Sequence, residues 1–172
     1  MSAVLQCEPV IVRPMQEDDL ANVGRIERAS YDFPWSTGIF SDCLRVGYSC
    51  WVLDAGSEGL CGYGIMSVAV EEGHVLNLCV APEARKRGLA RALLGHLLRT
   101  AVDHGAVTTY LEVRPTNAAA IALYNGVGFR HVGTRRDYYP AQTGREDAYI
   151  FSRSLIDGTA AFNDIEPLAL SR

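Results

Sequence analysis

A cationic turn that contains a glycine, Arg85-Lys86-Arg87-Gly88, joins a predicted strand to the first turn of an apolar-patterned helix that begins at Leu89. The first backbone N–H groups of a helix have no partner within the helix, and the helix dipole is positive at that end. Such a turn could bind a polyanion such as a pyrophosphate, and a phosphate-bearing cofactor is therefore one interpretation. The alternative is a solvated surface turn with ordinary charges.

Two further side chains could do acid–base chemistry. Glu112 lies near the end of a predicted strand, and Tyr124 lies in the helix that follows it. A carboxylate at a strand end in a cleft can accept a proton, and a phenol can donate one. The alternatives are a surface ion pair between Glu112 and Arg114, core packing of Tyr124, and a capping role alone for Asn117 at the start of the helix.

The hydrophobic pattern predicts the elements that would position these residues. Strands are expected at Val10–Arg13, Ser49–Asp54, Leu60–Val70, His74–Val80, Val107–Val113, Phe129–Asp137 and Asp147–Ser154, and helices at Glu17–Tyr31, after Ser36, at Gly88–His104 and at Asn117–Gly126. This order predicts an α/β fold with a mixed central sheet of about six to seven strands and helices on both faces. The first half is expected to be antiparallel, with a βαβ crossover between the strands that end at Val80 and Val113. Ligands in such sheets bind where adjacent strands or helices diverge.

Composition narrows the class of protein. With 172 residues, 48% of them hydrophobic and 21% charged, the chain fits one domain, expected over residues 1–155, with a tail over 156–172 that loses periodicity. The net charge of −4 makes the cationic turn stand out and favours a small anionic ligand over nucleic acid. The five cysteines are odd in number and lack C-x-x-C spacing, so buried reduced thiols in the cytoplasm are expected. No metal site is expected from the four histidines, which are interpreted as surface or structural residues, and no membrane span is expected.

The residues from Arg85 to Ala90 resemble the Q/R-x-x-G-x-G/A acetyl-coenzyme A (acetyl-CoA) signature of the GCN5-related N-acetyltransferase (GNAT) family, with Ala90 in place of the commoner final glycine. The resemblance continues through Leu111 to Arg114, Asn117 to Tyr124 and Gly128-Phe129, and covers roughly Val10 to Leu155. It implies the fold of that family, with splayed central strands.

Other segments are similar to family members that acetylate the N-terminal alanine of a small-subunit ribosomal protein. These segments are Phe33-Pro34-Trp35-Ser36, Asn117 to Tyr124, Arg135 to Pro140 and Gly144 to Ala148. The resemblance therefore implies a ribosomal protein N-terminus as the substrate. Other protein N-termini, lysines and small amines remain alternatives within the family, and a non-catalytic module that binds coenzyme A or a partner protein is an alternative outside it.

The resemblance also implies roles for individual residues. Contacts with acetyl-CoA are implied for Leu78, Cys79, Val80, Lys86, Arg87, Gly88, Leu89, Ala90, Arg91 and Asn117. Glu112 becomes the proton acceptor and Tyr124 the proton donor in a direct transfer without a metal or an acyl-enzyme. A groove for the peptide is expected between Phe33 and Trp35 on one side and Tyr138 and Tyr139 on the other, although a plain hairpin loop or stacking on single-stranded RNA could also explain the tyrosines. A monomer or weak homodimer is expected.

Overall fold

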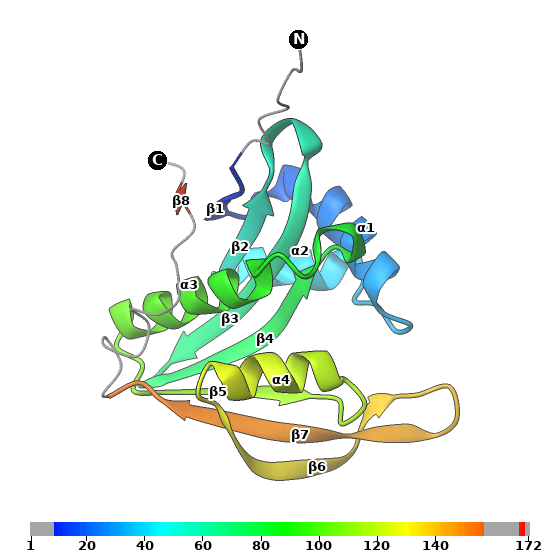
Figure 1. Cartoon of the computed structure of the whole chain (residues 1–172), viewed down its shortest axis with the longest axis vertical. Coiled ribbons are helices and arrows are strands. Elements are labelled where there is room, and N and C mark those ends of the chain that lie inside the picture. The colour runs from blue at the N-terminus through cyan, green and yellow to red at the C-terminus, as the bar shows by residue number, and fades with distance from the viewer. Residues whose placement is uncertain (1–8, 157–168, 171–172) are drawn as a thin grey trace.

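A single mixed sheet of eight strands organises the computed structural model, which describes residues 9–156 and 169–170 (Figure 1). The elements are β1 (Ile11–Pro14), α1 (Leu20–Ser30), α2 (Thr37–Arg45), β2 (Ser49–Asp54), β3 (Leu60–Ala69), β4 (Glu72–Val80), α3 (Leu89–Asp103), β5 (Thr108–Val113), α4 (Ala118–Gly126), β6 (Arg130–Pro140), β7 (Arg145–Ser154) and β8 (Ala169–Leu170). Short 3-10 turns occur at Glu17–Asp19, Gly56–Glu58 and Pro82–Ala84. The strand order across the sheet is β6-β7-β5-β4-β3-β2-β1-β8.

The seven predicted strands and the predicted helices are confirmed, with ends within three residues of those expected. The first half of the sheet is antiparallel, and β4 and β5 pair in parallel across the α3 crossover, as predicted. The eighth strand was not predicted: β8 pairs in parallel with the edge strand β1, opposite Ile11 and Val12. It lies in the segment expected to be a tail, of which residues 157–168 and 171–172 fall outside the described part of the chain.

Helices cover both faces of the sheet because side chains on successive strand residues point to opposite sides. On β3, Tyr63 packs against Phe40 of α2, with ring centroids 5.3 Å apart. Its neighbour Gly64 lies against α3, where an added Cβ would be 3.0 Å from a methyl carbon of Leu97. Thus α1 and α2 cover one face and α3 the other (Figure 1).

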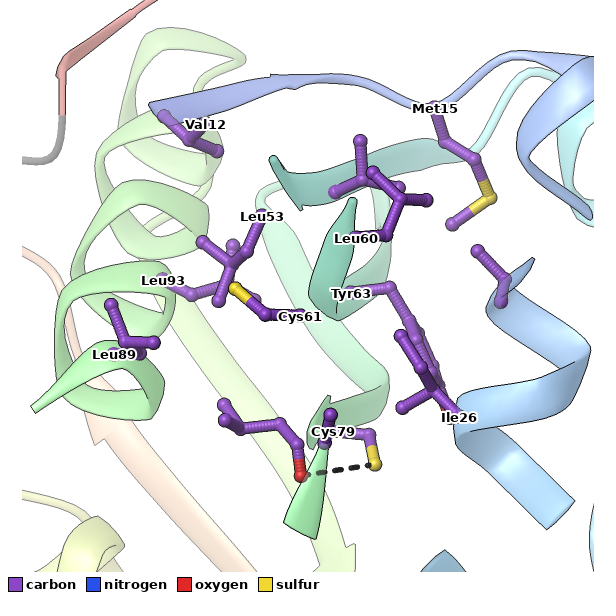
Figure 2. Close-up of a cluster of buried hydrophobic side chains, with 14 of the residues drawn as sticks. Val12, Met15, Ile26, Leu53, Leu60, Cys61, Tyr63, Cys79, Leu89 and Leu93 are labelled. Carbon is purple, nitrogen blue, oxygen red and sulfur yellow. Dashed lines mark hydrogen bonds between the residues drawn. The ribbon is translucent and has the colours of Figure 1, made fainter. Parts of the chain in front are cut away.

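The helices form where their apolar stripes can be buried. The apolar stripe that begins at Leu89 faces the core, and the buried residues of α3 are Leu89, Leu93, Leu94, Gly95, Leu97, Leu98 and Ala101. Figure 2 shows Leu89 and Leu93 of α3 on one side of the strands and Ile26 of α1 on the other. No helix in the described ranges is both long and apolar enough to cross a membrane.

Four of the five cysteines lie in the described part of the chain, and all four are buried free thiols, as predicted: Cys43, Cys50, Cys61 and Cys79. Burial raises the pKa of each of these thiols above its ordinary value. In Figure 2 the Cys79 Sγ atom points to the carbonyl oxygen of Val80, 3.9 Å away. Cys7 lies outside the described residues.

The two central parallel strands pair only at their beginnings. The register between β4 and β5 runs from Glu72 opposite Thr108 to Val75 opposite Leu111 and then stops. On the other side of β4, the pairing with β3 shifts between Val75 and Asn77, which makes Leu76 the extra residue of a bulge. The strands diverge beyond this point (Figure 1), so the predicted splay is present.

Candidate active site

A cavity of about 570 Å³ opens where β4 and β5 diverge. Its lining comes from the C-terminal part of α1 and the loop after it, the middle of β4, the end of β5, the start of α4 and the hairpin between β6 and β7. Four carboxylates face it against one guanidinium: Glu27, Asp32, Glu112, Glu146 and Arg114. The lining is therefore acidic and suits a cationic ligand.

Glu112 lies on the cavity side of β5 with a side chain that is 9% exposed. Its Oε2 atom is 2.5 Å from Nε2 of His74, and its Oε1 atom is 3.3 Å from Nε of Arg135. Burial alone would raise the pKa of this carboxyl, but the hydrogen bond and charge of His74 and the charge of Arg135 outweigh it and hold the pKa below its usual value. Glu112 is therefore an ionised carboxylate at neutral pH, and it is not paired with Arg114, which was one interpretation of the sequence.

Tyr124 lines the same cavity from α4 and is 7% exposed. Its ring packs against Phe129 and Phe151, with centroids 5.9 and 6.4 Å away. Burial raises the pKa of this phenol to about 12. Core packing and a chemical role, which the sequence left as alternatives, are thus compatible, because the ring is packed while the residue borders the cavity.

Three of the four aromatic residues expected to form the walls of a peptide groove lie at the cavity. Phe33, Trp35 and Tyr139 line the cavity, whereas Tyr138 does not and is 43% exposed. Tyr138 stacks edge-on against Tyr139 at 4.8 Å, and the guanidinium carbon of Arg135 lies 5.7 Å from its ring centre. Its position therefore supports Tyr139 from outside the cavity.

Arg114 connects the two walls. Its guanidinium carbon lies 4.4 Å from the ring centre of Tyr139 and 6.0 Å from that of Phe33. Its Nη1 atom donates to the carbonyl of Pro140 at 3.0 Å and pairs with Glu146 at 2.9 Å. Arg114 thus fixes the β6–β7 hairpin at the mouth of the cavity.

Glu27 holds the opposite wall from α1. It is 2% exposed, accepts a hydrogen bond of 2.8 Å from the backbone N–H of Trp35, and accepts one from the hydroxyl of Tyr63. Asn77 Nδ2 donates to the same carboxylate at 3.4 Å. A buried charge needs such donors, and they tie the loop after α1 to β3 and β4.

Most of the other residues predicted to contact acetyl-CoA lie at the end of β4 and in the turn that follows it. Leu78 lines the cavity, Cys79 and Val80 are buried behind it, and the turn from Arg85 to Gly88 is exposed at the start of α3. Lys86 and Gly88 have positive φ angles of 61° and 75°, and the helix has no side-chain N-cap. Arg85 Nε donates to the carbonyl of Val80 at 3.0 Å, which ties the turn to the end of β4.

The first N–H groups of α3 thus have no side-chain cap, an arrangement that can bind an anion, and Ala90 and Arg91 follow in the first helical turn. Asn117, the predicted cap of α4, does cap it, because its side chain accepts from the N–H of Ala120 at 3.1 Å, and it also borders the cavity. No group of three or more potential metal ligands occurs among the described residues.

Sequence reasoning missed His74, Glu27 and Arg114 as parts of the site, and it did not predict the contact of Arg135 with Glu112. One partial signal for His74 was available from the sequence, because the predicted βαβ crossover makes its strand a neighbour of the strand that carries Glu112. The structure supplies the register: His74 lies opposite Tyr110, and Tyr110 and Glu112 share one face of β5. The interpretation of His74 as merely a surface or structural residue is therefore incomplete, since its ring contacts the candidate base.

Comparisons with known proteins show the family of the chain. Residues 16–129 match the model of the family described as the acetyltransferase (GNAT) family. The chain is 37% identical over 141 residues to the [ribosomal protein bS18]-alanine N-acetyltransferase of Escherichia coli K12, covering 82% of this chain and 95% of that protein. The Salmonella typhimurium protein of the same name is 40% identical over 134 residues, covering 78% of this chain and 90% of its own length.

The crystal structure of the ribosomal-protein-S18-alanine N-acetyltransferase from Escherichia coli superposes with a TM-score of 0.78 at 36% identity, covering 84% of this chain and 93% of that one. The Arabidopsis thaliana NAA60 structure in complex with acetyl-CoA also has a TM-score of 0.78, but at 23% identity it supports the fold alone.

Proposed function

The chain belongs to the acetyltransferase (GNAT) family, and on this premise we propose that it transfers the acetyl group of acetyl-CoA to the N-terminal alanine of ribosomal protein bS18. The observation that carries the proposal is the cavity at the divergence of β4 and β5, which both Glu112 and Tyr124 border. The names of relatives at 37% and 40% identity supply the particular substrate.

Glu112 is proposed as the proton acceptor. An α-amino group with a pKa of about 8 is about 90% protonated at pH 7, so it must lose a proton before or during attack on a thioester. A carboxylate whose pKa is held low by His74 and Arg135 is a weak base toward a free ammonium group. As the new C–N bond forms, however, the nitrogen becomes far more acidic, and Glu112 can then accept its proton directly or through a water.

Tyr124 is proposed as the proton donor at the leaving sulfur. Because burial raises the pKa of its phenol to about 12, the hydroxyl keeps its proton throughout the neutral range. It can therefore donate a hydrogen bond to the negative charge that develops on sulfur. Backbone N–H groups near Cys79 and Val80, beside the splay, are proposed to stabilise the developing oxyanion.

The cationic turn is proposed to hold the pyrophosphate of acetyl-CoA. Its fit rests on exposed Lys86 and Arg87, two left-handed residues, and uncapped N–H groups at the start of α3. Acetyl-CoA, when bound, supplies an activated thioester; the residues of this chain orient it. Leu78 and Asn117, which border the cavity, are proposed to contact the pantetheine arm.

The peptide is proposed to enter between the α1–α2 loop and the β6–β7 hairpin. Carboxylates on both walls attract an α-ammonium group, and the aromatic rings of Phe33, Trp35 and Tyr139 supply apolar contact area. We propose that the protein acts as a monomer or a weak homodimer. Because the proposed substrate is a ribosomal protein, we propose that the reaction takes place in the cytoplasm.

The test is to incubate the protein with acetyl-CoA and a peptide that carries the N-terminal sequence of bS18, beginning with alanine, and to locate the acetyl group by mass spectrometry. We expect acetylation at the α-amine, and a loss of at least about 100-fold in kcat for Glu112→Gln. A peptide with a blocked N-terminus is the matched control. Acetylation of lysines or of a small amine, with none at the alanine, would overturn the proposal.

A further inference from the structure

His74 reaches Glu112 from the neighbouring strand. Its Nε2 atom lies 2.5 Å from Oε2 of Glu112, although the two residues are 38 positions apart in the chain. The His74 side chain is 36% exposed, whereas the Glu112 side chain is 9% exposed. The histidine is thus the outer member of a pair whose inner member borders the cavity.

The chemistry of the two groups determines which atom donates. An ionised carboxylate accepts hydrogen bonds but cannot donate them, so the proton between the two atoms belongs to Nε2 of His74. A hydrogen bond to an ionised acceptor is shorter and stronger than one between neutral groups. The contact therefore fixes the orientation of the Glu112 carboxylate.

The other carboxylate oxygen is held more loosely. Oε1 of Glu112 is 3.3 Å from Nε of Arg135, and the Arg135 side chain is 55% exposed. The two contacts differ in length, so the two oxygens can have different roles. The shorter contact, with His74, fixes Oε2, whereas the longer contact, with Arg135, leaves Oε1 able to accept a proton.

We propose that His74 is a positioning residue for the acetyl transfer, which donates its Nε2–H to Oε2 of Glu112 and so holds that carboxylate in the orientation in which it can accept a proton. This inference rests on the proposed function and extends it to a residue outside the family signature. His74 does not line the cavity, so it acts through Glu112.

Other charged and titratable groups also act on Glu112. His74 approaches from β4 and Arg135 from β6, and both favour the ionised form. Tyr139, also on β6, interacts with Glu112 electrostatically, but burial is the main cause that raises the pKa of its phenol and keeps it neutral. His74 is therefore the main contact to remove, because its hydrogen bond is the largest of the influences that lower the pKa of Glu112.

The experiment compares wild type with His74→Ala and His74→Gln. Glutamine keeps a side-chain N–H donor without a titrating ring, whereas alanine removes the donor. His104→Gln is the matched control, because His104 is exposed at the end of α3, its ring hydrogen-bonds the carbonyl oxygen of Thr100, and it does not line the cavity. Two readouts are taken: steady-state kinetics on the alanine-starting peptide, and titration of the Glu112 carboxyl carbon by NMR, identified as the signal that Glu112→Gln lacks.

In His74→Ala we expect kcat to fall about tenfold or more, the loss expected for one charge-assisted hydrogen bond, while KM for acetyl-CoA stays unchanged. The Glu112 carboxyl should titrate at higher pH than in wild type, and the acid limb of kcat should move the same way. His74→Gln should recover most of kcat, and His104→Gln should match wild type in both readouts.

A Glu112 titration that does not move in His74→Ala, or a kcat within twofold of wild type, would overturn the inference while leaving the proposed function intact. Equal losses of kcat in the alanine and glutamine variants would also overturn it, because the donor would then not matter. If the wild-type protein acetylated no peptide, the proposed function would fail, and the titration would still decide whether His74 controls the ionisation of Glu112.

Discussion

Replacing Tyr124 with phenylalanine removes a single oxygen atom from the candidate site. The ring would keep its contacts with Phe129 and Phe151, whose centroids lie 5.9 and 6.4 Å away. We therefore expect the free energy of unfolding to change by less than about 1 kcal/mol, since only the hydroxyl is removed and the packed ring remains. Any large effect of Tyr124→Phe on turnover can then be assigned to the hydroxyl.

The size of that effect follows from the pKa of the phenol. Tyr124 titrates at about 12, whereas an ordinary thiol has a pKa of about 8.5, so complete proton transfer to the leaving sulfur would be uphill by roughly 5 kcal/mol. The hydroxyl acts instead as a hydrogen-bond donor to a developing charge, which contributes about 1.5–3 kcal/mol. Tyr124→Phe should therefore lower kcat by about 10- to 150-fold.

The assay is steady-state release of coenzyme A thiol, with KM for acetyl-CoA and the thermal unfolding midpoint as controls for binding and folding. The pH dependence adds a second check. Because the phenol loses its proton only as pH rises through about 12, kcat of the wild type should not fall between pH 8 and pH 10. The reasoning is refuted if Tyr124→Phe keeps kcat within twofold, or if wild-type kcat falls with a midpoint at the ordinary phenol pKa of about 10.

Three further substitutions test the walls and the turn. Gly88→Ala should raise KM for acetyl-CoA severalfold with little change in kcat. Alanine reaches the φ of 75° only at a cost of about 1 kcal/mol, which strains the turn proposed to hold the pyrophosphate, whereas its Cβ would meet no atom within 4 Å and so causes no clash. An unchanged KM would contradict the assignment of this turn. Arg114→Leu removes the contacts with Tyr139 and Glu146, so it should raise KM for the peptide more than KM for acetyl-CoA, measured by varying each substrate in turn. Glu27→Gln should lower the free energy of unfolding in urea by about 1–3 kcal/mol, because a buried carboxylate would lose charge-assisted hydrogen bonds, and a midpoint equal to that of wild type would argue against this network.

The local features of the site could be predicted from the sequence because they depend on near neighbours. Alternation along Leu111, Glu112 and Val113 placed the carboxylate on the face opposite the buried residues, and the structure has Leu111 and Val113 buried. The apolar stripe from Leu89 onward gave α3 and its exposed cationic turn, and Asn117 signalled the start of α4.

The contacts between distant segments could not be predicted in the same way. Arg114 pairs with Glu146 instead of its near neighbour Glu112, and that choice depends on how the β6–β7 hairpin folds back over β5. The bulge at Leu76 and the end of β4–β5 pairing set which side chains meet at the cavity, and a shift of one residue in either strand would turn them to the other face. The short strand β8 depends on an unpaired edge of β1 that no local pattern reveals.

Glu112 and Tyr124 border one cavity, yet their surroundings push their pKa values in opposite directions. Hydrogen-bond donors and positive charge on β4 and β6 lower the pKa of the carboxyl, whereas burial against aromatic rings raises the pKa of the phenol. Between these two values Glu112 is ionised and Tyr124 is protonated, which are the states that a proton acceptor and a proton donor need before reaction. No ligand is needed to produce either protonation state, because the side chains that determine each pKa belong to the fold itself. The pH range of activity is therefore a property of the scaffold as much as of the two reacting side chains.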